Sequence, residues 1–488
     1  MLDGAFHEGA ESPRSDEGLA GYAPAVSLVC EGCGEVPRPL VCHPYPFRCE
    51  SAGVDAADHV LAPRLDPSRA RWPRCGDDRP FVKFRHLLHA HAAALSLGLD
   101  DDAYLDIVER LDERLHDIDG RSFRTTPFFR GAALEQALSA NGAPAGEIWI
   151  KNDTINVSGS HKARHLFGVL LHLEIVRQAG LEPDPAPPLA IASCGNAALA
   201  AAVCARAANR DLVVMVPPDA HPNVLARLRA LGADVRIHAR APGELGDPTV
   251  AAFRRAIAEG ALPFACQGTE CGLTLDGGKT LAYEIASAHV PFDRLFVQIG
   301  GGALASSVGR GLIEAHALGA LARLPRIMPV QTTAVAPLPR AYDRLVQAVR
   351  ERLPTTDLPR ETGDLLADRL RAPDVLPTVQ LVLSEMARAR PDWLPPWPSP
   401  VSSRAHGILD DETYDAMAIL RMVVETGGSP ITVPEATVER AESLCHETTS
   451  IEADATGTAG LAGLLDWHAR HAMSAAERSV LLFTGARR

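Results

Sequence analysis

Two segments of the chain carry a side chain placed to do chemistry on a small molecule. The polar loop of residues 151–161 follows a short apolar run and leads to Lys162 at the start of a predicted helix. A lysine in the first turn of a helix lies at the positive end of the helix dipole, where its own cation is disfavoured. This placement favours the neutral amine, which can form an imine. At the other end of the chain, the apolar run 481–483 leads to Thr484, whose hydroxyl would lie at the carboxyl end of a strand, where ligands of parallel sheets collect.

Two further segments offer backbone N–H groups. A predicted strand ends in a tight turn at residues 192–197, and a helix of small residues follows. The free N–H groups of such a helix start can bind a carboxylate, and Asn196 can hydrogen-bond a phenolic oxygen. Gly300, Gly301 and Gly302 come directly after another predicted strand, and their missing side chains let a phosphate approach the backbone. Each turn also fits an ordinary α/β connection. The glycine spacing matches neither a dinucleotide fingerprint nor a nucleotide P-loop, which argues against NAD and ATP.

The elements around these segments predict an α/β fold. From Glu147 onward, short apolar runs alternate with longer amphipathic ones, which is typical of a parallel sheet with covering helices. The runs predict strands at 147–151, 189–193, 211–216, 234–238, 294–299, 326–331 and 479–483. Helices are predicted at 161–179, 196–208, 221–231, 248–259, 279–289, 303–319, 411–427, 434–446 and 456–470. The Pro-rich stretch 336–404 is expected to be an irregular covering segment with some helix.

Composition narrows the class of protein. The chain has 488 residues, 46% of them hydrophobic, and a formal net charge of −13. This charge provides no cationic field for nucleic acid or an anionic membrane. Residues 1–20 lack the basic and apolar regions of a secretory signal, no apolar stretch is long enough to cross a bilayer, and the ten cysteines do not resemble a disulfide framework. We therefore expect a cytoplasmic protein with free thiols that acts on small molecules.

The order of the four segments resembles the fold-type II pyridoxal-phosphate enzymes, the family of threonine synthase, threonine dehydratase, cysteine synthase and the tryptophan synthase β subunit. Threonine synthase is the most similar of these, because its pattern is also echoed by residues 277–284, 325–337 and 451–460. The resemblance extends from about Glu147 to Gly485. It implies two open parallel-sheet subdomains, pyridoxal 5'-phosphate as cofactor, an amino-acid substrate and a homodimer.

The resemblance also implies a role for each matching residue. Lys162 would carry the cofactor as a Schiff base and later move protons at the substrate Cα. The other cofactor contacts would be Asn196, Gly300, Gly301, Gly302, Ala303 and Thr484, and the substrate carboxylate would be bound by Ser193, Cys194, Gly195, Asn196 and Ala197. The implied reaction is elimination or replacement at Cβ or Cγ, as in threonine synthase. The alternatives are a serine/threonine dehydratase-like ammonia lyase and a catalytically weak module that binds the cofactor or an amino acid.

Three departures from the threonine synthase pattern leave the substrate open. His161 precedes Lys162 where threonine synthases usually have Phe, and Ala163 follows it where they have Asp. The second segment has Cys194 and Ala197 in place of the usual Thr or Ser. Gln331 stands where the dehydratase and racemase branch often carries a metal-binding Glu, which argues against a cation there.

Residues 1–80 are rich in Cys, Pro and Gly and are expected to form a loop-like extension. Residues 81–488 would form the catalytic domain, with a smaller subdomain at about 155–270. Cys30, Cys33 and Cys49 resemble the zinc-ribbon-like start of some threonine synthases, but the second close ligand pair of such a site is missing. Only Cys42, His43 or Cys75 would be left to complete it. We therefore assign no metal ligand and expect at most substoichiometric zinc.

Overall fold

The larger of the two open sheets has six strands. The computed structural model describes residues 24–139, 146–241, 247–353, 358–360, 363–398, 402–471 and 474–487. In spatial order the six strands are β11 (Ile431–Val433), β10 (Arg326–Thr332), β9 (Arg294–Gln298), β12 (Arg478–Phe483), β4 (Glu147–Asn152) and β3 (Phe128–Arg130). All neighbours are parallel except β3, which pairs antiparallel with β4. The central strands are buried along nearly their whole length, as expected where helices cover both faces.

The smaller sheet has four parallel strands. Their order is β7 (Asp234–Ile237), β6 (Leu212–Val216), β5 (Leu189–Ala192) and β8 (Leu262–Pro263). The crossover helices are α6 (Asn196–Ala207), α7 (Pro222–Ala230) and α8 (Pro248–Ala258). Parallel strands need such crossovers because a tight hairpin cannot join their ends. The prediction of an α/β fold with two open, largely parallel sheets is confirmed.

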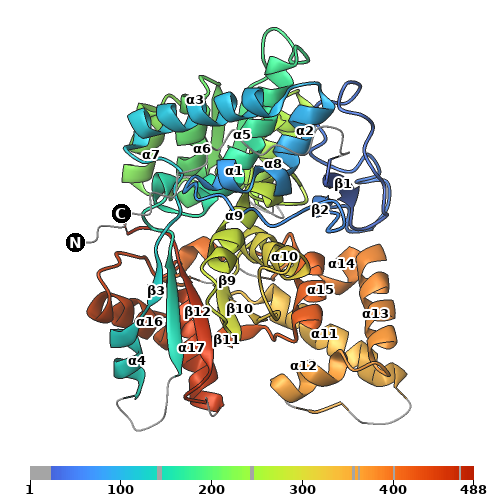
Figure 1. The fold of residues 1–488 in the computed structure, drawn as a ribbon, viewed down its shortest axis with the longest axis vertical. Coiled ribbons are helices and arrows are strands. Elements are labelled where there is room, and N and C mark those ends of the chain that lie inside the picture. The colour runs from blue at the N-terminus through green and yellow to red at the C-terminus, as the bar shows by residue number, and fades with distance from the viewer. Residues whose placement is uncertain are drawn as a thin grey trace, which may run out of the picture.

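Two helices at the centre of the molecule pack unusually closely. In Figure 1, α9 (Thr274–Ser287) lies between the upper part, which holds α5 (Lys162–Gln178) and the smaller sheet, and the lower part, which holds the larger sheet. A Cβ added to Gly277 would be 2.0 Å from the carbonyl oxygen of Arg164, and one added to Gly168 would be 2.8 Å from the backbone nitrogen of Gly277. Glycine at both positions therefore lets the two backbones touch.

The N-terminal extension is more ordered than expected. The antiparallel pair β1 (Val26–Cys30) and β2 (Leu61–Leu65) frames it, so the expectation of a purely loop-like segment is wrong. The strands escaped prediction because each has only five residues and they are 30 residues apart. Cys30, Cys33 and Cys49 come together inside this frame with His59, and not with Cys42, His43 or Cys75. Beyond it lie α1 (Pro80–Lys83), α2 (His89–Ser96) and α3 (Asp101–Asp119).

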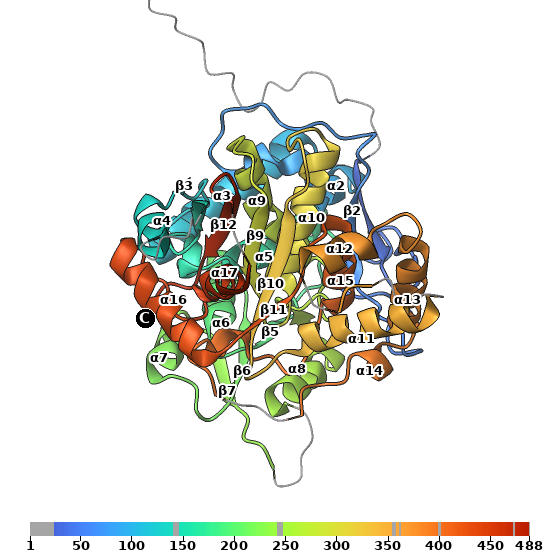
Figure 2. The same ribbon diagram turned by 90° about the horizontal axis from the view of Figure 1, so that it is seen from below.

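The stretch 336–404 is largely helical, where an irregular segment was expected. It forms α11 (Pro337–Arg352), α12 (Asp364–Leu370), α13 (Leu376–Arg388) and α14 (Arg390–Trp393). In α11, α13 and α14 the prolines that suggested irregular structure occupy the first turn. A proline is tolerated there because the first-turn N–H groups have no partner within the helix. These helices flank α15 (Ala416–Thr426) at one side of the molecule (Figure 2).

Helices α10 (Ala303–Ala317), α16 (Glu435–Thr448) and α17 (Ala459–Arg470) and strand β12 agree with the predictions to within a few residues, whereas the short strands β3, β8 and β11 and helix α4 (Ala132–Ser139) were not predicted. Helix α10 follows β9, and α16 and α17 precede β12. The short α4 joins β3 to β4 through residues outside the described ranges. Within the described part of the chain, no helix combines the length and the apolar character needed to span a membrane.

Candidate active site

The four chemical segments of the sequence are all connections at the carboxyl ends of parallel strands. The loop after β4 leads to Lys162, the turn after β5 leads to Asn196, β9 leads to the triple glycine, and β12 ends at Thr484. The first and last segments are joined by backbone hydrogen bonds, from the N–H of Asp153 to the carbonyl of Phe483 (2.7 Å) and from the N–H of Ala486 to the carbonyl of Gly159 (2.8 Å). The fold therefore gathers them at the edge where ligands of α/β sheets bind.

Lys162 differs from the other lysines of the chain. The sequence contains only four: Lys83, Lys151, Lys162 and Lys279. Lys151 is buried against Glu284 with a nitrogen–oxygen distance of 2.6 Å, and Lys279 is buried within 3.4 Å of two carboxylates. Lys83 lies on the short helix α1. Lys162 is half-buried at the first position of α5 and forms no hydrogen bond or ion pair with any described residue. Its amine is therefore available to a ligand.

Thr484 contacts His161, the residue that precedes Lys162. Its hydroxyl oxygen accepts a hydrogen bond from the backbone N–H of His161 (3.0 Å) and is 2.8 Å from the imidazole Nδ1. Burial, followed by the nearby Lys162 charge, lowers the pKa of His161 well below its ordinary value, so the ring is neutral. The Nδ1–H tautomer would donate to Thr484 and leave the hydroxyl hydrogen free for another acceptor.

Asn196 reaches across to the end of the chain. A Cβ built on Gly485 would be 3.2 Å from its Nδ2 atom, so the amide lies beside the Thr484–Gly485 segment. Among the described residues its side chain has no hydrogen-bond partner, which leaves it available to a ligand. Ser193 is engaged locally, because its hydroxyl accepts from the Gly195 N–H at 3.4 Å.

Cys194, which the sequence placed at the substrate carboxylate, is exposed. The packing of neighbouring atoms, and then the negative charges of Asp219, Asp247 and Asp410, raise its pKa. A raised pKa keeps the sulfur protonated at neutral pH, and the thiol is a poor nucleophile. The position therefore fits a contact residue better than a covalent catalyst.

The triple glycine is needed because another segment packs tightly against it. A Cβ on Gly300 would be 2.2 Å from Oδ2 of Asp410, and one on Gly301 would be 2.7 Å from the ring of Tyr414. Gly302 has a φ of +108°, in the left-handed region that favours glycine, and it caps the N-terminus of α10. Residues 407–414 thus form one wall of the site. They pack against the backbone of residues 300–302, where any side chain larger than that of glycine would clash.

Asp410 is a site residue that the sequence did not indicate. Its carboxylate lies within reach of the Gly301 N–H and of the Lys162 charge. Desolvation raises the pKa of Asp410 to about 6, although the Lys162 cation opposes this. A carboxyl group with such a pKa gains and loses a proton near neutral pH, as a general acid or base must. No local motif marks Asp410, because it is brought to the glycine loop by a long connection.

A charge-balanced group of side chains lies directly behind Lys162. Arg164 pairs with Asp153 at 2.8 Å and with Glu284 at 2.5 Å, and Glu284 also pairs with Lys151. Burial alone would raise the pKa of Glu284, but the Arg164 and Lys151 cations outweigh it and lower the value. With two cations and two anions this group can remain charged inside the protein.

A family model described as pyridoxal-phosphate dependent enzyme matches residues 122–373, slightly more than half of the chain. The chain belongs to this family. The matched range contains Lys162, Asn196 and the triple glycine, whereas Asp410 and Thr484 lie beyond it. Members of the family depend on pyridoxal phosphate, so the expected cofactor is confirmed.

Relatives of this pyridoxal-phosphate enzyme catalyse different reactions. The chain is 26% identical to a threonine synthase of Methanocaldococcus jannaschii over 221 residues, 44% of this chain and 50% of that protein. It is 23% identical to a biosynthetic L-threonine dehydratase of Haemophilus influenzae over 205 residues, 42% of this chain and 36% of that protein. The chain thus spans half or less of the length of these curated relatives.

Solved structures support the fold of this pyridoxal-phosphate enzyme. Maize serine racemase superposes with a TM-score of 0.51 at 16% identity, covering 78% of this chain and 93% of that one. Threonine deaminase isoform 2 of Solanum lycopersicum gives a TM-score of 0.52 at 14% identity, covering 80% and 92%. At these identities the likeness concerns the fold alone, and it confirms the fold-type II architecture.

The residues of the site fit pyridoxal phosphate. Lys162 is a primary amine without an ion-pair partner among the described residues. The backbone at Gly300 and Gly301 approaches the carboxylate of Asp410 with no side chain in between. A carboxylate already faces this loop, as a phosphate oxygen would. The free amide of Asn196 and the hydroxyl of Thr484 offer neutral hydrogen bonds to the rest of a ring.

Proposed function

We propose that this enzyme catalyses elimination or replacement at Cβ or Cγ of an amino acid, in the manner of threonine synthase. The observation that carries the proposal is the position of Lys162. Unlike Lys151 and Lys279, it forms no ion pair with any described residue; it follows His161, which contacts Thr484, and its charge acts on Asp410 beside the triple glycine. The 26% identity to a threonine synthase supports this reaction class.

In this proposal the cofactor is held from four sides. Lys162 binds it covalently through its amine, and Gly300, Gly301, Gly302 and Ala303 bind the phosphate through backbone N–H groups and the start of α10. Asn196 would donate to the ring oxygen. Thr484 would place its hydroxyl at the ring nitrogen, freed for this by the His161 hydrogen bonds. The bound cofactor supplies the electron sink for a negative charge at the substrate Cα.

The substrate carboxylate would be bound at the start of α6. The residues of this turn are Ser193, Cys194, Gly195, Asn196 and Ala197, and a helix start presents free N–H groups to an anion. The amine of Lys162 would move the proton at the substrate Cα. Asp410, with its pKa near 6, would give a proton to the leaving group farther along the side chain.

A serine/threonine dehydratase-like ammonia lyase is the second candidate. The match to a threonine dehydratase favours it, and the same arrangement of Lys162 and Asp410 would expel a β-hydroxyl group as water. The two candidates differ in product. A dehydratase releases a 2-oxo acid and ammonia, whereas a synthase retains the amino group and releases the leaving group, such as phosphate, alone.

Product analysis with a panel of amino acids tests the proposal. Holo-protein would be incubated with hydroxy, phospho and thio amino acids while 2-oxo acid, ammonia, phosphate and thiol are measured. We expect leaving-group release from at least one class, absent in Lys162→Ala and retained in the matched control Lys83→Ala. Binding without any release, seen only as a spectral change, would instead indicate a module that binds the cofactor or an amino acid.

We also propose that residues 81–488 form the catalytic domain of a homodimer, with a smaller subdomain at about 155–270. Sedimentation of the purified protein would check the dimer. A chain that begins near Arg79 should retain the absorbance of the bound cofactor if residues 1–80 only cover the catalytic domain. Loss of that absorbance would show that the extension belongs to the same folding unit.

A further inference from the structure

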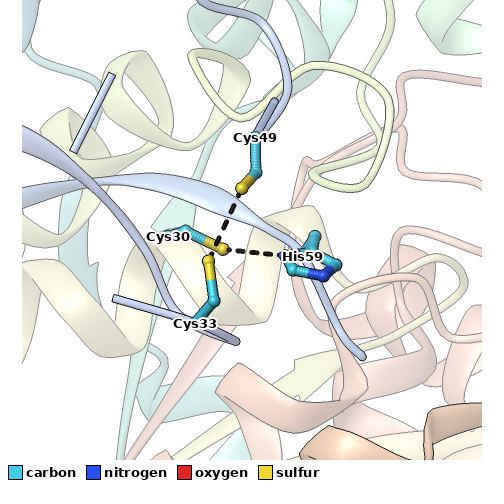
Figure 3. Close-up of side chains that lie close together, drawn as sticks. All are labelled: Cys30, Cys33, Cys49 and His59. Atoms are coloured by element: carbon cyan, nitrogen blue, oxygen red, sulfur yellow. Dashed lines mark hydrogen bonds between the residues drawn. The ribbon is translucent and has the colours of Figure 1, made fainter. Parts of the chain in front are cut away.

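Four metal-binding side chains meet in the N-terminal extension, away from the proposed active site. Cys30 lies at the end of β1, Cys33 in the turn after it, Cys49 in the following loop, and His59 just before β2. Their donor atoms all lie within 4.8 Å of one another (Figure 3). The three sulfurs are free thiols, and Cys33 and Cys49 are 3.6 Å apart, far longer than a disulfide bond of about 2.05 Å.

Two of the distances between these atoms match those of a tetrahedral zinc site. With Zn–S distances of about 2.3 Å, two sulfur ligands at the tetrahedral angle lie about 3.8 Å apart, and with a Zn–N distance of about 2.0 Å a sulfur and a nitrogen lie about 3.5 Å apart. The observed distances are 3.6 Å between the sulfurs of Cys33 and Cys49 and 3.5 Å between the Cys30 sulfur and Nδ1 of His59. The atoms are therefore already spaced to share one ion.

The histidine is oriented as a metal ligand. Its Nδ1 faces the sulfurs, while its Nε2 lies 2.9 Å from the carboxylate of Asp55. Metal-binding histidines almost always donate their second N–H to a carboxylate, a carbonyl or water, which fixes the ring and increases its basicity. Asp55 fixes the ring in this way, so the nitrogen facing the sulfurs is a ready acceptor for a cation.

We propose that Cys30, Cys33, Cys49 and His59 bind one structural zinc ion. Binding would displace the three thiol protons to solvent and leave three thiolates and one neutral imidazole around the metal. All four positions would be filled by protein, which is characteristic of structural rather than catalytic zinc. The expectation of substoichiometric zinc depended on a missing second ligand pair, and His59 supplies the fourth donor that was not recognised.

The residues next to two of the ligands join the extension to the catalytic body. Glu31, adjacent to Cys30, pairs with Arg310 of α10. Asp58, adjacent to His59, pairs with Arg390 at 2.8 Å, and its N–H bonds the carbonyl of Ala387 at 2.7 Å. Helix α10 begins at the triple glycine. The zinc site would therefore hold the two residues that anchor the extension to this helix and to α13–α14.

The carboxylate of Glu35 also lies close to the sulfurs. Its Oε2 accepts from Ser51 at 2.9 Å and lies 3.1 Å from the Cys49 sulfur. It could compete with His59 as the fourth ligand. Glu35→Gln distinguishes the two, since it keeps the size of the side chain and removes its charge.

Metal content and cobalt substitution test the proposal directly. Protein produced with zinc and purified without chelator should contain about one zinc per chain, measured by mass spectrometry of the metal. Removal of the metal and addition of Co²⁺ should give thiolate-to-cobalt charge-transfer absorption. Neither readout depends on catalysis, so the result is independent of the proposed reaction.

Matched variants assign the ligands. Cys33→Ser, at an exposed position, and His59→Ala should each lose most of the bound zinc and of the cobalt absorption. The controls Cys42→Ser, Cys75→Ser and Glu35→Gln should keep both signals. Wild-type protein that takes up neither zinc nor cobalt would overturn the proposal, and so would controls that lose as much metal as Cys33→Ser. If His59→Ala fails to fold, cobalt titration of the wild-type protein and of Cys33→Ser still decides the outcome.

Discussion

Two groups of charged side chains adjoin the proposed cofactor site. In one group the numbers of cations and anions are equal, and in the other the carboxyl groups outnumber the cations. Behind Lys162, two cations and two anions form mutual ion pairs: Lys151, Arg164, Asp153 and Glu284. Beside the glycine loop, carboxyl groups predominate. Asp415, whose N–H bonds the Gly301 carbonyl, forms no ion pair with any described residue, and Asp58 has Arg390 as its partner.

The pKa values of the two groups differ accordingly. In the paired group, the cations hold the pKa of Glu284 below its ordinary value despite burial. In the acidic group, desolvation raises the pKa of Asp415 to about 7 and those of Asp58 and Asp410 to about 6, and the charges of Asp58 and Glu31 add to the effect at Asp415. The comparison shows that side chains with balanced charges keep one protonation state near neutral pH and stabilise the fold. Carboxyls without a full complement of cations exchange protons near neutral pH.

Removing one cation from the balanced group should have the largest effect. Arg164→Met leaves two buried carboxylates against a single cation, and we expect a loss of about 3–5 kcal/mol in the free energy of unfolding, measured with urea. The control Arg124→Met removes a partly exposed partner of Asp112 and should lose less than about 1 kcal/mol.

A second substitution sharpens this prediction. The double variant Arg164→Met/Glu284→Gln again has equal numbers of cations and anions, in Lys151 and Asp153. It should be less destabilised than the sum of the two single variants, because no buried charge is left uncompensated. Simple additivity would mean that the four residues do not act as a balanced group.

Asp410→Asn should separate chemistry from cofactor binding in the acidic group. The variant should retain the cofactor, because it removes a negative charge that faces the phosphate loop, and should lose about 10²-fold in kcat. The change in kcat/KM with pH near 6 should disappear with it. Asp411→Asn, the adjacent control, should keep the wild-type profile. An Asp410→Asn enzyme with an unchanged profile would exclude this residue as the proton donor.

The contribution of two buried acids to stability should fall as the pH rises through their pKa values. Because the pKa values of Asp58 and Asp415 are raised in the folded state, that state binds more protons than the unfolded chain between about pH 4 and 7. These two acids should therefore stabilise the folded state more at pH 5.5 than at pH 7.5, whereas the buried histidines with lowered pKa values, His161 among them, act in the opposite direction. Asp415→Asn should reduce this difference by on the order of 1–3 kcal/mol. Asp234→Asn, at an exposed position on β7, should leave it unchanged.

The smallest effect is expected at Thr484, whose neutral hydroxyl belongs to neither group. Thr484→Ser keeps the oxygen that accepts from His161 and should unfold like the wild type. Thr484→Val removes it and should lose about 1 kcal/mol. Equal stability of the two variants would show that the His161 hydrogen bonds do not contribute.

Sequence reasoning succeeded where function depends on local backbone form. Lys162, Asn196 and the triple glycine each follow a short apolar run, and a strand that leads into a helix can be predicted from such a run. It failed where a proline is compatible both with irregular structure and with the first turn of a helix. Pro337 and Pro391 begin helices, but in the sequence they suggested irregular structure.

Residues that act through long-range contacts were missed for a different reason. His59 is ten positions after Cys49 and lacks a close partner of its own, so ligand spacing does not reveal it. Asp410 reaches the glycine loop only after the chain has passed through strand β10 and helices α10 to α14. No periodicity or motif in the sequence predicts these contacts between distant residues, because the contacts depend on how the helices and strands pack.

The sequence by itself determined the α/β class and the family of the enzyme, and it pointed to the lysine that we propose holds the cofactor. These follow from hydrophobic periodicity, from glycine and from the order of the motifs, all of which are local properties of the chain. Only the tertiary structure decided that Asp410 faces Lys162 and that His59 joins three cysteines. The physical reason is that proximity between distant residues, and the desolvation that raises the pKa of Asp410, exist only once the chain has packed.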